Sequence, residues 1–314
     1  MEVRGILAAV VLLASLPLTA QQETPSQPAS QSYPESTASP ASIPDLTPGT
    51  DGKLSQEQMQ QLLRVVAEKD IDNDKRQRDY TYIEREVQKN FDGKGHVKST
   101  EIKTYEILDI AGEQVERLIQ KDDKPLESKE AAKEDEKIQK IIDKRKNETD
   151  EQRRKREEKD QKEREDGRKF VKEIADAYNF KLVGTELVGG REAWVIDGEP
   201  RPGFEPHMKD AKFLSKIHGR VWIDKSDLQL SKLDVEMLDT ISFGLVIARL
   251  HKGTRFSLEQ TRVNDEVWLP RRVQAFASAR LGLLKVLRME QEISYANWGE
   301  SQTDSPVMSQ AKGW

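Results

Sequence analysis

The stretch HGRVWIDKSDLQLSKLDVEM, residues 218–237, has the pattern of a β-hairpin. From Arg220 to Ile223 the side chains alternate between polar or amphipathic and aliphatic, which is the two-residue period of a strand with one buried face. The short polar side chains that begin at Asp224 favour a tight turn. Alternation then resumes from Leu233 to Met237. The stretch therefore predicts two antiparallel strands, each with one solvent-exposed face.

Similar hairpins fill most of the chain. Period-two segments are predicted at 80–91, 97–110 and 115–119, and further strands follow Tyr178, separated by glycine- or asparagine-containing turns such as Gly189-Gly190. About nine or more strands joined by short turns predict an α+β fold built on one large, curved, antiparallel sheet.

Three amphipathic segments predict helices that cover the concave face of this sheet, at 56–69, 132–142 and 170–178. Between Asp143 and Asp166 the chain has no aliphatic or aromatic residue, and opposite charges recur three and four residues apart. Such pairs stabilise a helix in solvent. The segment at about 127–178 is therefore predicted to be a charged helical insertion, either a solvated arm or a contact for a partner protein.

The two ends of the chain differ in composition from this body. Residues 1–20 have the short apolar run of a signal peptide, with cleavage near Ala20, and an uncleaved anchor is the alternative. Residues 21–53, rich in Pro, Ser and Gln, predict a disordered linker, and 300–314 predict a disordered tail. The folded domain is thus expected at 54–299, in an exported protein.

The composition excludes several functional classes. Of 314 residues, 34% are charged, yet the formal net charge is only −5, which argues against a nucleic-acid-binding protein. There is no cysteine, so disulfides, thiol catalysis and thiolate metal sites are excluded.

Nothing in the sequence predicts an enzyme, a metal site or a cofactor. The four histidines share no ligand spacing, and no G-x-S-x-G motif or phosphate-binding loop is present. Asp224 and Asp227 lack the remaining ligands of a calcium loop, and their turn position accounts for them.

A binding role remains, and it depends on the apolar face of the sheet. The longest apolar row is predicted on one strand, with the tentative ligand-binding residues Leu281, Leu283, Leu287, Met289 and Ile293. This row either lines a groove for a hydrophobic ligand or belongs to an ordinary core closed by the helices. The residues alone favour neither.

Two motifs resemble the LolA/LolB-like superfamily of periplasmic lipoprotein carriers, over roughly residues 55–298. One has the G-x-x-W-I-D form and the other reads W-L-P, and both are structural in that family: Gly219, Trp222, Ile223 and Asp224, then Trp268, Leu269 and Pro270. The charged segment at 143–166 departs from the compact family pattern, and no lid arginine can be matched to a position here.

The resemblance implies a half-barrel whose mouth is closed by helices. It also implies a function: shielding the acyl chains of a lipid or lipoprotein in the periplasm for transfer towards the outer membrane, with transient membrane contact. The alternative is a non-enzymatic envelope regulatory, sensor or interaction protein that uses the same fold, with 143–166 as the contact for an envelope protein. Lipid that co-purifies with the protein would distinguish the two.

Overall fold

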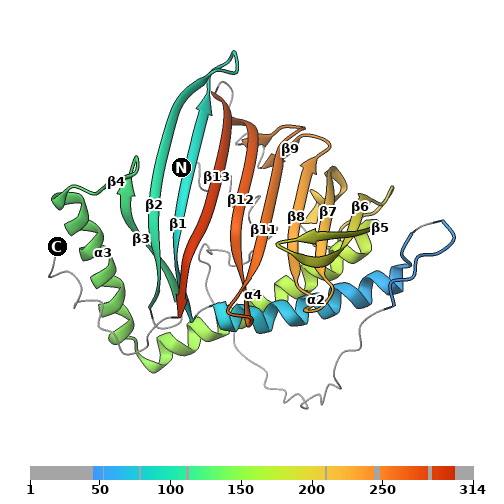
Figure 1. Cartoon of the computed structure of the whole chain (residues 1–314), viewed down its shortest axis with the longest axis horizontal. Coiled ribbons are helices and arrows are strands. Elements are labelled where there is room, and N and C mark those ends of the chain that lie inside the picture. Colours follow the sequence, from blue (N-terminus) through green and yellow to red (C-terminus); the bar gives the residue numbers. More distant parts are fainter. Residues whose placement is uncertain are drawn as a thin grey trace.

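The computed structural model describes residues 45–51, 53–77, 79–110, 113–208, 211–243, 248–281 and 285–300. Within these ranges thirteen strands form one antiparallel sheet, and its path runs from β4 at one end to β5 at the other without closing into a barrel. The predicted α+β architecture with a large, curved, antiparallel sheet is therefore confirmed (Figure 1). The disordered tail predicted at 300–314 lies, beyond Glu300, outside the described residues.

The elements follow the chain as a run of strands, a helical insertion and a second run of strands. The helices are α2 (Gln56–Gln77), α3 (Ser128–Lys146), α4 (Asp150–Ala177) and the short η2 (Leu214–Lys216). The strands before the insertion are β1 (Tyr80–Phe91), β2 (Val97–Ile110), β3 (Glu113–Lys121) and β4 (Lys124–Pro125). Those after it are β5 (Tyr178–Val188), β6 (Arg191–Pro200), β7 (Ile217–Asp224), β8 (Leu230–Met237), β9 (Ile241–Phe243), β10 (Ala248–Leu250), β11 (Arg255–Val263), β12 (Val267–Leu281) and β13 (Lys285–Glu300).

The strand order is β4-β3-β2-β1-β13-β12-β11-β8-β7-β6-β5. The first strand and the last strand meet in the middle of the sheet, because β1 pairs with β13 over almost its whole length. The small β9–β10 hairpin is joined to the end of β12 through β10. The hairpin predicted at 218–237 is present as β7 and β8, with Val221 opposite Leu233.

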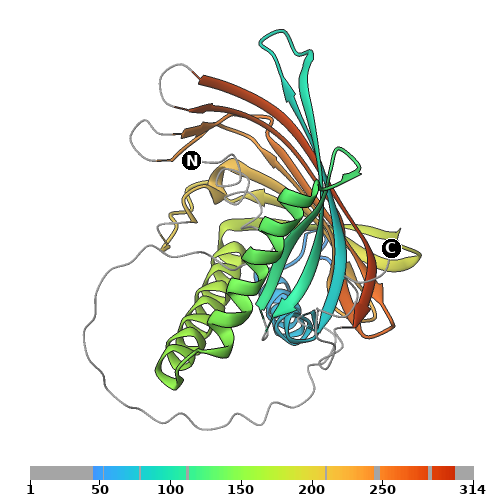
Figure 2. The same cartoon turned by 90° about the vertical axis from the view of Figure 1, so that its left-hand side faces the viewer.

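Helices α2 and α4 lie on the concave side of the sheet, and α3 lies against its β3 end (Figure 2). Near one end, Ile138 of α3 packs with Ile110 and Val115 of β2 and β3. Near the other, α2 and α4 close a core in which Met59 and Leu62 of α2 meet strands β5 to β7. Helices α2 and α4 begin at capping boxes, formed by Ser55 with Gln58 and by Thr149 with Gln152.

Two element boundaries differ from the sequence-based expectation. The helix expected at 170–178 is only the end of α4, since the charged residues before it continue the same helix. Leu46 is buried in the core beside α2, so the docked part of the chain begins inside the expected linker 21–53. The part of that linker before Asp45, and the expected signal peptide 1–20, lie outside the described residues.

Candidate functional site: an apolar surface on the concave face

A large apolar surface covers the concave side of strands β7 to β13. Its buried members are Ile217, Leu233, Met237, Ile241, Leu250, Phe256, Leu258, Val273, Ala275, Ala277, Ala279, Met289 and Ile293. Every one of these residues belongs to a strand. Among the described residues no helix contributes to this cluster, whereas the core beside it contains residues of both α2 and α4. The apolar surface is thus distinct from the helix-covered core.

The middle of the apolar surface is lined by alanines. Along β12 the side chains of Val273, Ala275, Ala277 and Ala279 are buried on the concave side and alternate with residues of the opposite face. Alternation of this kind is the two-residue period of the pleat. Methyl side chains rise little above the sheet, so the central strand is lower than its neighbours.

Larger side chains stand on both sides of this alanine row. On one side Phe256 of β11 lies opposite Ala275. On the other, Met289 of β13 lies opposite Ala277, and Leu287 lies opposite Ala279. The two flanking strands are about 10 Å apart, which is two strand spacings. The alanine row therefore lies between two rows of larger apolar side chains, and these three buried or half-buried rows together are called the trough below.

The trough has a polar border at β1. On the concave side of this strand Glu84 lies opposite Tyr295 of β13, and Glu86 lies opposite Ile293. Burial raises the pKa of the Tyr295 hydroxyl well above its usual value, and the nearby Glu84 carboxylate adds to this shift. The apolar surface thus ends in a row of polar groups at the β13–β1 boundary.

Three of the five predicted ligand-binding residues lie on the apolar surface or at its wall. Met289 and Ile293 are buried members, and Leu287 is half-buried beside them on β13. The prediction that Leu281 continues the same strand is wrong, because it is the last residue of β12 and pairs with Lys285 at the start of β13. Leu283 lies between these strands, outside the described residues.

The chain reverses at this point for a reason visible in the sequence. Gly282 interrupts the run of leucines, and glycine favours turns. Because apolar residues lie on both sides of Gly282, the sequence of the two strands resembles that of one long strand. The alanine row itself was missed, although its signal is present as the alternation V-Q-A-F-A-S-A-R over residues 273–280. Alanine has weak strand preference, so a search for bulky apolar residues passes over it.

The family-like motif residues take structural positions at the edge of the helix-covered core. Trp222 is buried on the opposite face of the sheet, where its Nε1 donates to Glu186 at 2.8 Å and Lys232 lies 4.1 Å from the ring centroid. Ile223 points to the core beneath α2, and Gly219 lies opposite Val235.

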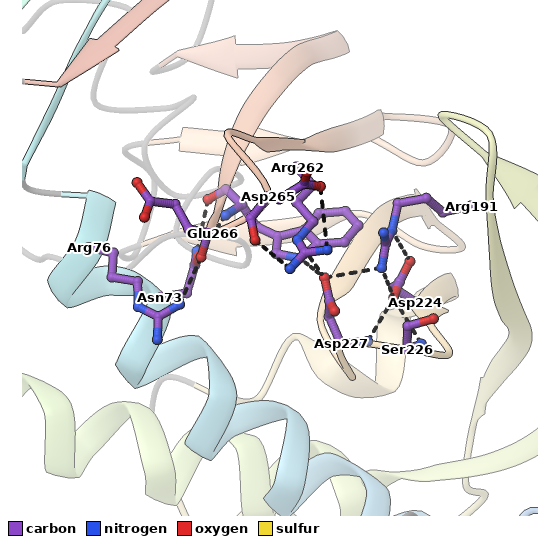
Figure 3. Close-up of polar contacts among 10 residues, drawn as sticks. Asn73, Arg76, Arg191, Asp224, Ser226, Asp227, Arg262, Asp265 and Glu266 are labelled. Carbon is purple, nitrogen blue, oxygen red and sulfur yellow. Dashed lines mark hydrogen bonds and ion pairs between the residues drawn. The ribbon is translucent and has the colours of Figure 1, made fainter.

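Asp224 is the centre of a polar network shown in Figure 3. It is buried and accepts two hydrogen bonds from Arg191, at 2.7 and 2.9 Å, and two more from the backbone N–H groups of Ser226 and Asp227. Burial disfavours the charged form of Asp224, but these bonds outweigh it and hold the pKa of the carboxyl below its usual value. The carboxylate therefore orders the β7–β8 turn.

The W-L-P motif joins the same network. The Nε1 of Trp268 donates to Asp227 at 2.9 Å, and Arg191 lies over the Trp268 ring at 5.5 Å from its centroid. Leu269 is buried with Tyr80 of β1. Pro270 lies beside a register shift in β11, a common place for proline because it has no N–H to donate.

A hollow of about 910 Å³ lies on the opposite, polar face of the sheet. Its walls carry both charges, and much of this charge is paired, as in Lys89 with Glu290 and Arg255 with Glu236. Such pairs account for the polar lining without a ligand.

Within the described ranges no group of three His, Cys, Asp or Glu side chains could hold a metal ion. In the same part of the chain no helix is long and apolar enough to cross a bilayer.

Comparison with known proteins gives matches only among solved structures. No family model and no curated protein matches the chain. A domain described as an outer membrane lipoprotein-sorting protein from Vibrio parahaemolyticus is 12% identical, with a TM-score of 0.33, over 79% of this chain and 95% of that one. A LolA superfamily protein from Nitrosomonas europaea is 8% identical, with a TM-score of 0.28, over 79% and 94% of the two chains.

A third match is a chain of the Pseudomonas aeruginosa MucA/MucB complex. It is 11% identical, with a TM-score of 0.22, over 77% of this chain and 99% of that one. Similarity at this level does not transfer a function from one chain to another.

Proposed function

We propose that this protein is a carrier that shields the acyl chains of a lipid or lipoprotein on its apolar surface. The observation that supports the proposal is the alanine-floored trough along β12, in a cluster to which no described helix contributes. A saturated acyl chain is narrow and has no polar group to satisfy, so it needs only apolar walls. Each buried methylene contributes about 0.8 kcal/mol to binding.

The proposed ligand is an amphiphile because the trough ends at a polar border. Acyl chains would lie along β12, and the polar head would lie towards Glu84 and Glu86 of β1. The protein would act without catalysis, as a stoichiometric carrier, in the periplasm after export by the segment 1–20. Transfer towards the outer membrane would then involve transient membrane contact.

The decisive experiment fills the trough. Ala277→Leu adds three carbons to its floor, and we expect the affinity for a fluorescent long-chain fatty acid to fall at least about tenfold. In a closed core the same change would overpack the site and cost about 1–3 kcal/mol. In a trough it should change the melting temperature little.

The matched control is Ser278→Leu, which adds a similar side chain on the opposite face of the same strand. It should leave the affinity unchanged. Absence of acyl binding in the parent protein would contradict the carrier proposal. A large loss of stability in Ala277→Leu without a change in affinity would show that this surface is ordinary core.

A second candidate function is that of an envelope interaction protein that uses the charged part of α4 as its contact. The observation that favours it is the exposure of this segment: side chains such as Arg154, Lys155 and Glu158 form ion pairs along the helix and are about two-thirds exposed. Mass spectrometry of organic extracts from natively purified protein separates the two candidates. Co-purified acyl lipid supports the carrier, and its absence leaves the interaction protein.

A further inference from the structure

The sheet has one protected end and one open end. At the β3 end, α3 covers the outer edge: Glu134 accepts from the backbone N–H of Leu118 at 3.3 Å, and Lys137 donates to the carbonyl of Glu116 at 3.0 Å. At the other end, β5 is the last strand (Figure 1). Free edges are where a further strand can add, so their protection is informative.

Only the first half of β5 is covered on its outer side. Lys53 forms a bridge with Lys181, and the N–H of Leu54 donates to the carbonyl of Phe180 at 3.2 Å. Beyond this point, along residues 182–188, the described chain provides no strand on the outer side. Seven residues are long enough to pair with another strand.

The open half of β5 carries exposed apolar side chains. Leu187 is 71% exposed and Val183 is 47% exposed, although both belong to a strand. Edge strands of soluble proteins usually carry lysine, proline or other blocking residues at such positions. Two such features are present in 182–188: a register shift between Leu182 and Gly184, at the start of the open half, and the charged side chain of Glu186.

The sequence of this half, Leu-Val-Gly-Thr-Glu-Leu-Val, is symmetric in hydrophobicity about Thr185. In an antiparallel pairing with a second copy, a two-fold axis at Thr185 sets Val183 opposite Leu187 and Leu182 opposite Val188. Glu186 then meets Gly184, so the two carboxylates are not opposed. The same patch serves on both sides, which is the requirement for a two-fold symmetric dimer.

We propose that two copies of this chain associate through the outer edges of their β5 strands, residues 182–188, to form a continuous sheet. The pairing adds cross-strand apolar contacts and a strand ladder, as in other cases of strand addition. The interface is separated from β12 by four strands of the sheet, so it leaves the apolar surface free. Dimer formation should therefore not depend on the carrier proposal.

The test is analytical ultracentrifugation of the protein over a range of concentrations. The parent protein should show a monomer–dimer equilibrium. Leu187→Lys should raise the dimer dissociation constant at least about tenfold, because it places a charge opposite Val183 and adds an edge lysine. Val97→Lys is the matched control, since Val97 is a valine on β2 that is 52% exposed and far from β5 in strand order.

The double variant Val183→Glu/Leu187→Lys tests the register. Across the two-fold axis each new carboxylate faces a new ammonium group, so association should recover relative to Leu187→Lys. A parent protein that stays monomeric at about millimolar concentration overturns the proposal. The proposal is also overturned if Leu187→Lys does not weaken the dimer, or if Val97→Lys weakens it as much. If the double variant does not recover association, the pairing about Thr185 is overturned. Circular dichroism confirms that each variant is folded.

Discussion

The side chain of Asn73 forms hydrogen bonds with both backbone groups of Trp268. Its Nδ2 donates to the Trp268 carbonyl at 2.8 Å, and its Oδ1 accepts from the Trp268 N–H at 2.7 Å. Asn73 is buried on α2 (Figure 3), and Trp268 lies at the start of β12. An asparagine side chain thus replaces the neighbouring strand that β12 lacks here, and it attaches α2 to the sheet.

The first prediction concerns this attachment. Asn73→Ala leaves the Trp268 N–H without its acceptor, and we expect the free energy of unfolding to fall by about 2 kcal/mol. Denaturant unfolding measures the effect. Asn90→Ala is the control, because the described hydrogen bonds of Asn90 join it to the side chains of Gln88 and Ser99 rather than to backbone groups, and the change should cost less than about 0.5 kcal/mol. Equal effects of the two variants would contradict the role given to Asn73.

The second prediction is a pH dependence that arises from Asp224. Its pKa is lowered in the folded protein, so its contribution to stability is complete above the unfolded pKa of about 4 and is lost as the pH falls through the folded value. We expect Asp224→Asn to lower stability by about 3 kcal/mol at neutral pH, since it breaks a buried ion pair with Arg191.

The difference between the parent and Asp224→Asn should shrink below about pH 4, because the parent carboxyl is then itself neutral. Urea unfolding at a series of pH values measures this difference. Asp150→Asn is the control, since the Asp150 side chain is fully exposed and should leave the pH profile as it is. A constant difference at all pH values would show that Asp224 acts only through packing.

The third prediction concerns the segment before α2. Leu46 is 7% exposed, and the side chain of Gln58 donates to the carbonyls of Asp45 and Thr47. A chain that begins at Leu54 should therefore be less stable by about 2 kcal/mol, the value of one buried leucine. A chain that begins at Asp45 should keep the full melting temperature. Leu46→Ser in the full chain should reproduce most of the loss, and full stability of the shorter chain would refute the docking of this segment.

The fourth prediction concerns the charged part of α4. Residues 150–166 are helical, but ion pairs such as Arg154–Glu158 and Lys155–Glu151 are exposed and few apolar neighbours protect the backbone. We expect their amides to exchange with solvent at least about 100-fold faster than those of β12, measured by hydrogen exchange and mass spectrometry. The end of α4 near Ile174, which packs on the core, should exchange more slowly and serves as the internal reference. Slow exchange over 150–166 would mean that this segment packs on another surface.

Local features of the fold could be predicted from the sequence because neighbouring residues decide them. The alternation in 218–237 specifies a hairpin through the pleat and the turn residues, and the capping box at Thr149 specifies a helix start through two hydrogen bonds within four residues. The charged helical insertion followed from the spacing of opposite charges. The same local rules failed at Gly282, where apolar residues on both sides hid the change of strand.

The candidate site depended on contacts that no local pattern contains. The trough exists because Phe256, Ala277 and Met289, from three different strands, are brought side by side by the pairing of β11, β12 and β13. Asn73 and Trp268 meet although 195 residues separate them. An amphipathic pattern states that a face will be buried, but it does not state what will bury it. That choice is made by the packing of distant elements, which left one part of the concave face beneath α2 and α4 and gave the other no described helix.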